Sequence, residues 1–216
     1  FQNMLTTQFL PHLIRGTCEN GNKELVMSEA IINIGVFNDS REVFDFGVKM
    51  WRGRAPAYIY LARDGPKPVE PVGCGPALWG NKGFMPQLVE GLLQETARDS
   101  NHANMGLAGM VNAAETARQQ GADLYSEQGG RIMAALEFQA QYLAPMNAAP
   151  PDKLAFNVHP TWEIAFNHFH GRLGHKLPRI AGVLPLIRPT GVNHHMAWET
   201  LTHGGLGAIG LPSLKQ

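Results

Sequence analysis

Apolar residues recur at spacings of three and four along much of the chain, which is the pattern of amphipathic helices. Residues 24–37 carry this pattern and predict one helix. Asp39 and Ser40 are suited to cap a second helix over residues 41–52. Residues 55–61 are short and apolar, and they either finish this helix or form a turn of their own.

The same periodicity predicts more helices in the rest of the chain. They cover residues 86–95, a segment that starts at Asn101 or Asn104 and runs to about residue 120, and residues 126–143, 161–172 and 195–201. Gly121 suits the end of a helix. Residues 65–84 are rich in Gly and Pro and predict a long surface loop, a kind of segment that is often functional. Residues 144–152 predict a linker.

Strand signals are nearly absent, so we predict an all-α protein built from antiparallel helix pairs. Two arrangements fit this pattern. One is an irregular bundle, and the other is part of an (α/α) toroid, in which inner and outer helices alternate around a cleft. Long loops between helix pairs favour the toroid, because its loops line the cleft. The 216 residues suit one domain, residues 1–216, with a core of its own.

The composition of the chain limits the classes of molecule that it is expected to bind. Lys and Arg together number 18, as do Asp and Glu, so we predict neither nucleic-acid nor membrane binding. The chain has no apolar run of about 18 residues or more, the length that would predict a transmembrane helix. The first residues show no signal-peptide pattern and no initiator Met, so we expect a processed chain or a fragment. Cys18 and Cys74 either form the disulfide of a secreted protein or stay free, and being isolated they do not predict a metal site or a cofactor.

Three polar clusters are candidates for chemistry, and the first spans residues 94–102. It contains Gln94 and ends in Asn101 and His102, at a predicted helix start where unpaired backbone N–H groups favour anions. A purely structural explanation also fits: Ser100 or Asn101 caps the helix, and His102 is partly buried with a partner of its own.

The second cluster lies within residues 161–170. Asn167 and His170 share a helix face, whereas His168 and His170 point about 200° apart. Helices that bind a metal usually place two histidines about four residues apart, so this pair does not suit one ion. A polar surface stripe explains the cluster equally well.

The third cluster spans residues 188–199. Arg188 is able to grip a carboxylate with two hydrogen bonds, or to form a surface ion pair. For the neighbours His194 and His195 we expect one to face a cleft and the other the core.

Aromatic residues near these clusters have two explanations. Trp162 and Trp198 could stack on sugar rings, although tryptophans more often belong to the core. Of Tyr58 and Tyr60, one could expose its hydroxyl while the other packs.

In this order, the three clusters resemble the alginate lyase superfamily of polysaccharide lyases. The resemblance covers most of the chain, residues 21–205, and its best segments are residues 94–102, 160–168 and 188–200. The resemblance implies an (α/α) toroid with a cleft for an anionic polysaccharide or oligosaccharide, such as alginate or glucuronan. It also implies β-elimination at a 1,4-linked uronate. In that reaction the C6 carboxylate is neutralised, a base takes the C5 proton and an acid protonates the leaving O4.

The family's Asn–His pair at a helix start neutralises the carboxylate and contributes to base chemistry, which the resemblance transfers to Asn101 and His102. Its tyrosine acid lies near the place where this chain has Phe166 and Phe169, which have no hydroxyl. Either Tyr58 or Tyr60, or a histidine such as His168, His170 or His195, is therefore expected to be the acid, or the chain is not an active lyase. The residues expected to bind substrate are Gln94, Trp162, Asn167, His170, Arg188, His195 and Trp198.

A full toroid of this kind is longer than 216 residues. We therefore expect the chain to lack part of a longer ancestor's N-terminus, and a second chain or a homo-oligomer to complete the cleft. The leading hypothesis is a secreted or periplasmic lyase of glucuronan or alginate. Its alternative is a lectin-like carbohydrate-binding protein on a lyase scaffold without catalysis. A metal-dependent hydrolase that uses the histidines, and an interaction protein without a site, are further alternatives.

Overall fold

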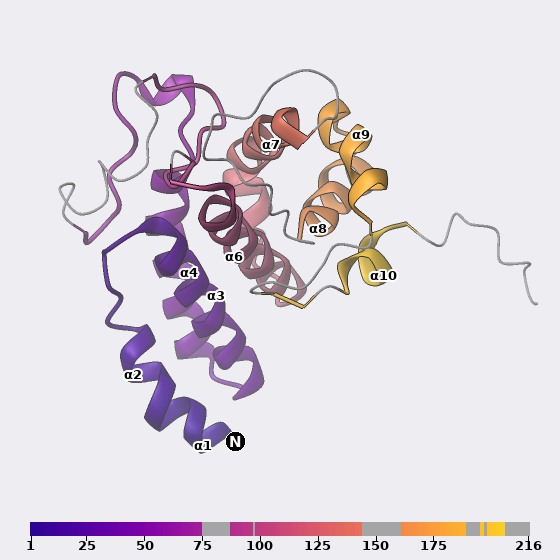
Figure 1. Ribbon diagram of the computed structural model, residues 1–216. Helices are drawn as coiled ribbons and strands as arrows, with labels where there is room; N and C mark the ends of the chain where they lie inside the picture. The colour runs from indigo at the N-terminus through magenta and orange to yellow at the C-terminus, as the bar shows by residue number, and fades with distance from the viewer. Residues whose placement is uncertain (75–86, 97, 144–160, 189–194, 197, 206–216) are drawn as a thin grey trace, which may run out of the picture.

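The structure is a computed structural model that describes residues 1–74, 87–96, 98–143, 161–188, 195–196 and 198–205 (Figure 1). It is mostly helical, which confirms the predicted all-α class. Within these ranges, strand-like pairing is confined to one isolated bridge between Ile59 and Leu93. The helices in chain order are α1 (Gln2–Met4), η1 (Leu5–Phe9), α2 (Leu10–Leu13), α3 (Gly21–Phe37), α4 (Arg41–Tyr58), η2 (Ala62–Asp64), α6 (Ser100–Gln119), α7 (Leu124–Leu143), α8 (Trp162–Phe166), η3 (Asn167–Arg172), α9 (Pro178–Ile187) and α10 (Glu199–His203).

Most of the long predicted helices are confirmed. α3, α4, α7 and the continuous α8–η3 segment match the apolar periodicity. Ser40 caps α4 by accepting a hydrogen bond from the Val43 amide at 3.4 Å, and α4 continues through Pro56 to Tyr58. Gly121 follows α6 with a φ of 83°, as expected for a glycine past a helix end. Residues 65–74 of the predicted loop have no regular secondary structure, as expected, whereas the rest of that loop and the predicted linker lie outside the described residues.

The helix predicted over residues 86–95 is wrong for its described part, which forms turns. Here tertiary hydrogen bonds override the helical pattern. The amide of Gln94 donates to the carbonyl of Tyr58, and the amide of Tyr60 donates to that of Leu92, both at 2.8 Å. The last helix starts at Glu199 rather than at residue 195. Residues 2–13 and 178–187 are also helical, which the periodicity did not predict.

α3 and α4 form a closely packed antiparallel pair. Gly35 of α3 lies against Phe44, and Gly47 of α4 lies against Ile32. A Cβ atom on Gly35 would lie 2.5 Å from the Phe44 backbone nitrogen, and one on Gly47 would lie 2.7 Å from Cγ1 of Ile32. Both glycines are therefore needed for the two axes to approach this closely.

α3 and α6 run parallel to each other in a fixed register. Three side-chain contacts join them, and each joins residues 83 apart in the sequence: Asn22 to Met105, Asn112 to Glu29, and Thr116 to Asn33. A constant offset requires two helices that advance in the same direction at the same rate.

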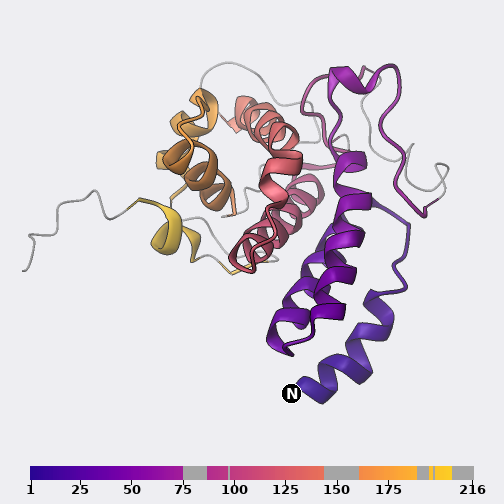
Figure 2. The same cartoon turned by 180° about the vertical axis from the view of Figure 1, so that it is seen from behind.

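The helices alternate between two layers. α3 contacts α6 and α6 contacts α8, while α4 contacts α7 and α7 contacts α9. Figures 1 and 2 show the pairs α3–α4, α6–α7 and α8–α9 side by side. One core cluster includes buried side chains from all six of these helices. This alternation is what an (α/α) toroid requires, and a closed toroid and a single domain over residues 1–216 stay predictions. None of the described helices has the length and apolar character needed to cross a membrane.

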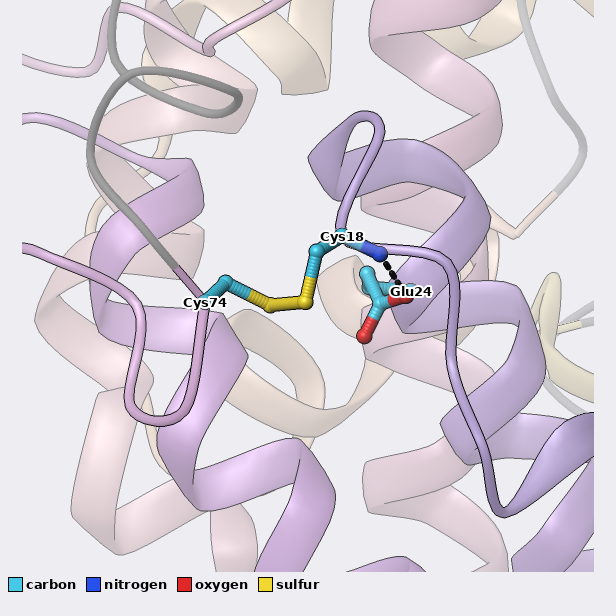
Figure 3. Close-up of side chains that lie close together, drawn as sticks. All are labelled: Cys18, Glu24 and Cys74. Carbon is cyan, nitrogen blue, oxygen red and sulfur yellow. Dashed lines mark hydrogen bonds between the residues drawn. A yellow bond between two sulfur atoms is a disulfide. The ribbon is translucent and has the colours of Figure 1, made fainter.

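Cys18 and Cys74 form a disulfide, with their Cα atoms 5.4 Å apart (Figure 3). This bond decides between the two alternatives that the sequence leaves open. Beside it lies the fully buried Glu24 of α3, whose carboxylate accepts hydrogen bonds from the amide of Cys18 at 2.9 Å and from Nε of Arg54 at 2.8 Å. Burial raises the pKa of Glu24, but these bonds and one from the Thr17 amide outweigh it and lower the pKa.

Candidate functional site

The start of α6 is capped by Asp99. Its backbone is extended, with a φ of −175°, and its Oδ1 accepts the backbone N–H of His102 at 2.8 Å. The cap predicted at Ser100 or Asn101 is therefore wrong, because the capping residue lies one position before Ser100 and two before Asn101. Asn101 is the second residue of α6 and His102 the third, so both lie on the first turn of the helix, as predicted. The backbone N–H of His102 is bonded to Asp99 and is therefore not open to an anion.

The imidazole of His102 folds back onto the same Asp99. Its Nδ1 lies 2.8 Å from Oδ1 and 2.7 Å from Oδ2 of the carboxylate. About a third of each side chain is exposed. Burial raises the pKa of Asp99, but the hydrogen bonds from the His102 amide and ring, with the charge of Arg98, outweigh it, and the pKa is lowered. Asp99 is therefore an ionised partner of His102.

Sequence reasoning missed Asp99 and two charged neighbours. Arg98, about half exposed, lies 3.9 Å from Asp99 and 3.4 Å from the buried Glu95. The signal that could have found Asp99 is its place three residues before His102, at the boundary between a polar loop and an apolar helix.

Tyr58 lies beneath this turn and does not face a cleft. Its side chain is fully buried, and its hydroxyl donates to the carbonyl of Ala103 at 2.9 Å, with the carbonyl of His102 at 3.2 Å. Burial, followed by the charges of Glu95 and Asp99, raises the pKa of Tyr58 well above its ordinary value. This environment opposes the predicted role of Tyr58 as a proton donor to substrate.

Tyr60 and Gln94 are likewise occupied by structural contacts. The hydroxyl of Tyr60, which is 7% exposed, donates to the carbonyl of Gly65 at 2.7 Å. Gln94 is fully buried, and its Oε1 accepts the amide of Gly21, the first residue of α3, at 2.6 Å. Gln94 therefore holds the start of α3 against the end of α4 and does not reach out to a ligand.

Arg188 binds a carboxylate of the protein itself. Its Nη2 lies 2.6 Å from Oε2 of Glu163, its Nε bonds the other oxygen, and this hydrogen bonding raises the pKa of Arg188. Glu163 is almost fully buried and also accepts from Thr200 at 3.4 Å. The two hydrogen bonds predicted between Arg188 and a carboxylate are therefore made to Glu163, and they join α8 to the end of α9.

The two tryptophans differ in environment. Trp162 is 1% exposed and belongs to the core. Its burial agrees with the expectation that a tryptophan packs in the core, and it opposes stacking of Trp162 on a sugar ring. Trp198 is 65% exposed and is accessible to a ligand.

His195 pairs with α3. Its Nε2 lies 3.1 Å from Oε2 of Glu29. Burial lowers the pKa of His195, but the hydrogen bond and charge of Glu29 outweigh it, and the pKa is raised. His194 lies outside the described residues.

The second cluster lies around η3. Asn167 donates to the carbonyl of His203 at 3.0 Å, and the exposed His170 places Nδ1 at 2.8 Å from the carbonyl of His175. His168 stacks on Tyr125 with ring centroids 3.9 Å apart, and burial lowers the pKa of His168. Each of these side chains has an intramolecular contact.

The structure does not bring His168 to His102. The hydroxyl of Tyr125, on which His168 stacks, lies 3.4 Å from the carbonyl of Val111. Val111 lies nine residues after His102, about 14 Å further along α6 at 1.5 Å per residue. An acid and a base that act on one glycosidic bond must both reach it, so these two histidines do not form one catalytic pair here.

Among the residues that the structure describes, one group has the spacing of metal ligands: Cys18, Glu24 and Cys74 (Figure 3). The two sulfur atoms are bonded to each other, so neither is a thiolate that could bind a metal. Glu24 is engaged with two backbone amides and Arg54. The group therefore fastens a loop to α3 and α4.

The fold and the site together describe an all-α protein that is built from layered helix pairs. It has an Asp–His pair at the N-terminal end of one long helix. Residues 81–149 match the sequence profile of the family described as alginate lyase. The predicted resemblance is therefore confirmed over this segment, which contains residues 94–102. The later clusters, at 160–168 and 188–200, lie outside it. No curated protein and no solved structure matched the chain. The match supports a polysaccharide lyase-like function in general terms.

Proposed function

We propose that the protein is a polysaccharide lyase that cleaves a 1,4-linked uronate polymer, glucuronan or alginate, by β-elimination. The observation that carries this proposal is the Asp99–His102 pair on the first turn of α6, inside the segment that matches alginate lyases. A base on the first turn of a helix combines the two properties that the reaction needs: proton removal by the imidazole and stabilisation of negative charge by the helix dipole.

The charge that develops at the C6 carboxylate can be stabilised from two sources. The helix dipole at the start of α6 and the side-chain amide of Asn101 are suited to stabilise the enolate. Arg98 is about half exposed beside Asp99 and adds a positive charge to the same turn. Asn101 therefore keeps its predicted role of stabilising the charge on the C6 carboxylate, and Arg98 is assigned the same role.

We assign both proton transfers to His102. It takes the C5 proton, the C4–O4 bond breaks as the C4–C5 double bond forms, and the imidazolium then protonates O4. Tyr58 and Tyr60 donate to backbone carbonyls, and Phe166 and Phe169 have no hydroxyl. One group serves both steps when the C5 proton and O4 lie on the same side of the sugar ring.

The first test measures turnover. The protein is incubated with glucuronan, alginate and polymannuronate while the ultraviolet absorbance of unsaturated uronates is followed. His102→Ala should lower kcat on the best substrate by about 10²–10⁴-fold, the usual contribution of a general acid–base group. His12→Ala, in the exposed α2, is the matched control and should leave kcat unchanged. Turnover of His102→Ala close to that of the wild type would exclude this site.

A second candidate is a carbohydrate-binding protein on the same scaffold without catalysis. It is favoured by the burial of Tyr58 and Tyr60 and by the phenylalanines at 166 and 169. Calorimetric binding of uronate oligosaccharides, with no unsaturated product from any of the three polymers, would select this candidate over the lyase.

We also propose that the protein works outside the cytoplasm, secreted or periplasmic, because disulfides persist in oxidising compartments. A second chain or a homo-oligomer completing the cleft belongs to the same proposal. Light scattering of the purified protein measures the oligomer, and cell fractionation measures the compartment.

A further inference from the structure

We propose that Asp99 is a positioning residue that fixes the tautomer of His102, so that Nε2 is the atom that exchanges protons with substrate. The inference rests on the proposed function for its catalytic meaning, whereas the tautomer itself is a property of the resting protein.

The tautomer follows from the chemistry of the pair. An ionised carboxylate only accepts hydrogen bonds, and Nδ1 lies within 2.8 Å of both oxygens of Asp99. Nδ1 must therefore carry the proton, and a neutral imidazole then has its lone pair on Nε2. The lowered pKa of Asp99 keeps this carboxylate ionised.

The orientation of the ring is fixed by a second bond to the same carboxylate. Oδ1 of Asp99 accepts the backbone amide of His102 at 2.8 Å as well as its ring. Backbone and side chain of one residue are thus held by one neighbour, which restricts rotation of the imidazole. Nε of Arg98 lies 3.9 Å from Oδ2 and adds a positive charge near the carboxylate.

The Nε2 atom of His102 is available to exchange a proton with substrate. About a third of the His102 side chain is exposed, and within the part of the chain that the structure describes its other ring nitrogen has no hydrogen-bond partner. Catalytic histidines elsewhere use the same division of labour, in which a carboxylate orients one nitrogen and the other transfers the proton.

Asp99 also caps α6, so the test must separate capping from positioning. Asp99→Asn and Asp99→Ser both retain residues that cap helices well, while they remove the negative charge. Asp123 offers a matched control: its Oδ1 accepts the amide of Ser126 at 3.0 Å near the start of α7, the same local contact without a histidine. Asp123→Asn therefore changes a cap of the same kind elsewhere.

The tautomer is read by NMR of protein labelled with ¹⁵N-histidine, at a pH where the ring of His102 is neutral; His102→Gln assigns its signals. The wild type and Asp123→Asn should show His102 with the proton on Nδ1. Asp99→Asn and Asp99→Ser should lose this preference and gain the Nε2–H form, while thermal unfolding confirms that they fold. A wild type with the proton on Nε2, or an Asp99→Ser variant that keeps the wild-type tautomer, would overturn the inference.

Kinetics add the catalytic readout. On the best uronate substrate, Asp99→Asn should lower kcat by about 10²–10⁴-fold, the scale seen when the orienting carboxylate of a catalytic histidine is neutralised, and should leave KM nearly unchanged. A loss confined to KM would contradict positioning. If no uronate is cleaved but the tautomer depends on Asp99, the lyase proposal fails and the structural assignment stands.

Discussion

Asp64 and Arg131 show what a buried charge does in this protein. Two hydrogen bonds of 2.6 Å join them, and their side chains are 6% and 7% exposed. Arg131 also donates to the carbonyl of Ile59 at 2.6 Å. The pair thereby ties η2 and the end of α4 to α7. The hydrogen bond from Arg131 lowers the pKa of Asp64 below its ordinary value.

Asp64→Asn should destabilise the protein by about 3–5 kcal/mol, because it leaves Arg131 buried without a counter-charge. The pH dependence has a defined sign. The folded pKa of Asp64 is depressed, so its contribution is complete above the unfolded pKa of about 3.9 and is lost as the pH falls through the folded value. Denaturant unfolding at neutral and acidic pH should show a smaller loss in the variant than in the wild type.

The control for this pair is Asp45→Asn. Asp45 bonds Arg41 one turn away on the exposed face of α4, where solvent screens the interaction. Its removal should change stability little. A cost as large as that of Asp64→Asn would show that burial is not the cause.

The position of a residue was predictable where it depends on local sequence. His102 was expected near a helix start and lies there, because a polar run ahead of an apolar periodic segment marks such a start. Its partner Asp99 was missed, because the cap and the ring contact depend on the extended backbone of one loop residue. Tyr58 was expected to serve as an acid, but the sequence does not reveal that its hydroxyl meets the α6 backbone 45 residues later.

At the scale of elements, contacts between helices depend on glycines at crossing points. Gly106 of α6 lies over Tyr58, and a Cβ atom there would lie 2.3 Å from Cζ of that ring. Tyr58 is fully buried and has no room to withdraw. α6 therefore keeps its position over the end of α4 only with glycine at this place.

Gly106→Ala should destabilise the protein by about 1–3 kcal/mol through overpacking, although alanine is the better helix former. Gly182→Ala is the matched control in α9, where nothing lies within 4 Å of the added methyl group. It should stabilise the protein by about 0.5–1 kcal/mol. Thermal unfolding of both variants measures the contrast, and equal shifts would contradict the close contact at Gly106.

Periodicity predicted the long helices but not their exceptions. α3, α4 and α7 follow the apolar pattern, since their buried faces repeat with the helical period. Residues 87–95 have similar composition but pair with the end of α4 instead. α9 was missed, although Pro178 at its first position is compatible with a helix.

At the scale of the molecule, the Cys18–Cys74 bond closes a loop that contains the whole α3–α4 pair. The two cysteines are 56 residues apart. A loop of this length restricts the unfolded chain, and in the chain-entropy model the restriction stabilises the folded state by about 4 kcal/mol.

Replacement of both cysteines by serine should therefore lower the free energy of unfolding by about 2–4 kcal/mol. Reductant should shift the denaturation midpoint of the wild type toward that of the Cys18→Ser/Cys74→Ser variant and leave the variant itself unchanged. A wild type that is insensitive to reductant under unfolding conditions would contradict the bond.

The global arrangement was the least predictable level. Antiparallel pairs follow from the sequence, but the parallel register of α3 and α6 depends on contacts between residues 83 apart. The three polar clusters were expected to line one cleft. His102 instead lies at the first turn of α6, and His168 stacks on Tyr125, whose hydroxyl meets α6 at Val111, nine residues further along the helix.

The closed loop between Cys18 and Cys74 also bears on how the molecule survives attack by proteases. The segment after η2 is largely exposed, with Pro66 and Lys67 accessible to solvent. A single cut there would sever the backbone, yet the two fragments would stay covalently joined through the sulfur bridge. The bridge would keep the first fragment, which contains α3 and α4, at high effective concentration beside the second fragment, which contains α6 and α7, so the damage would be confined to one loop while the oxidised bond lasts.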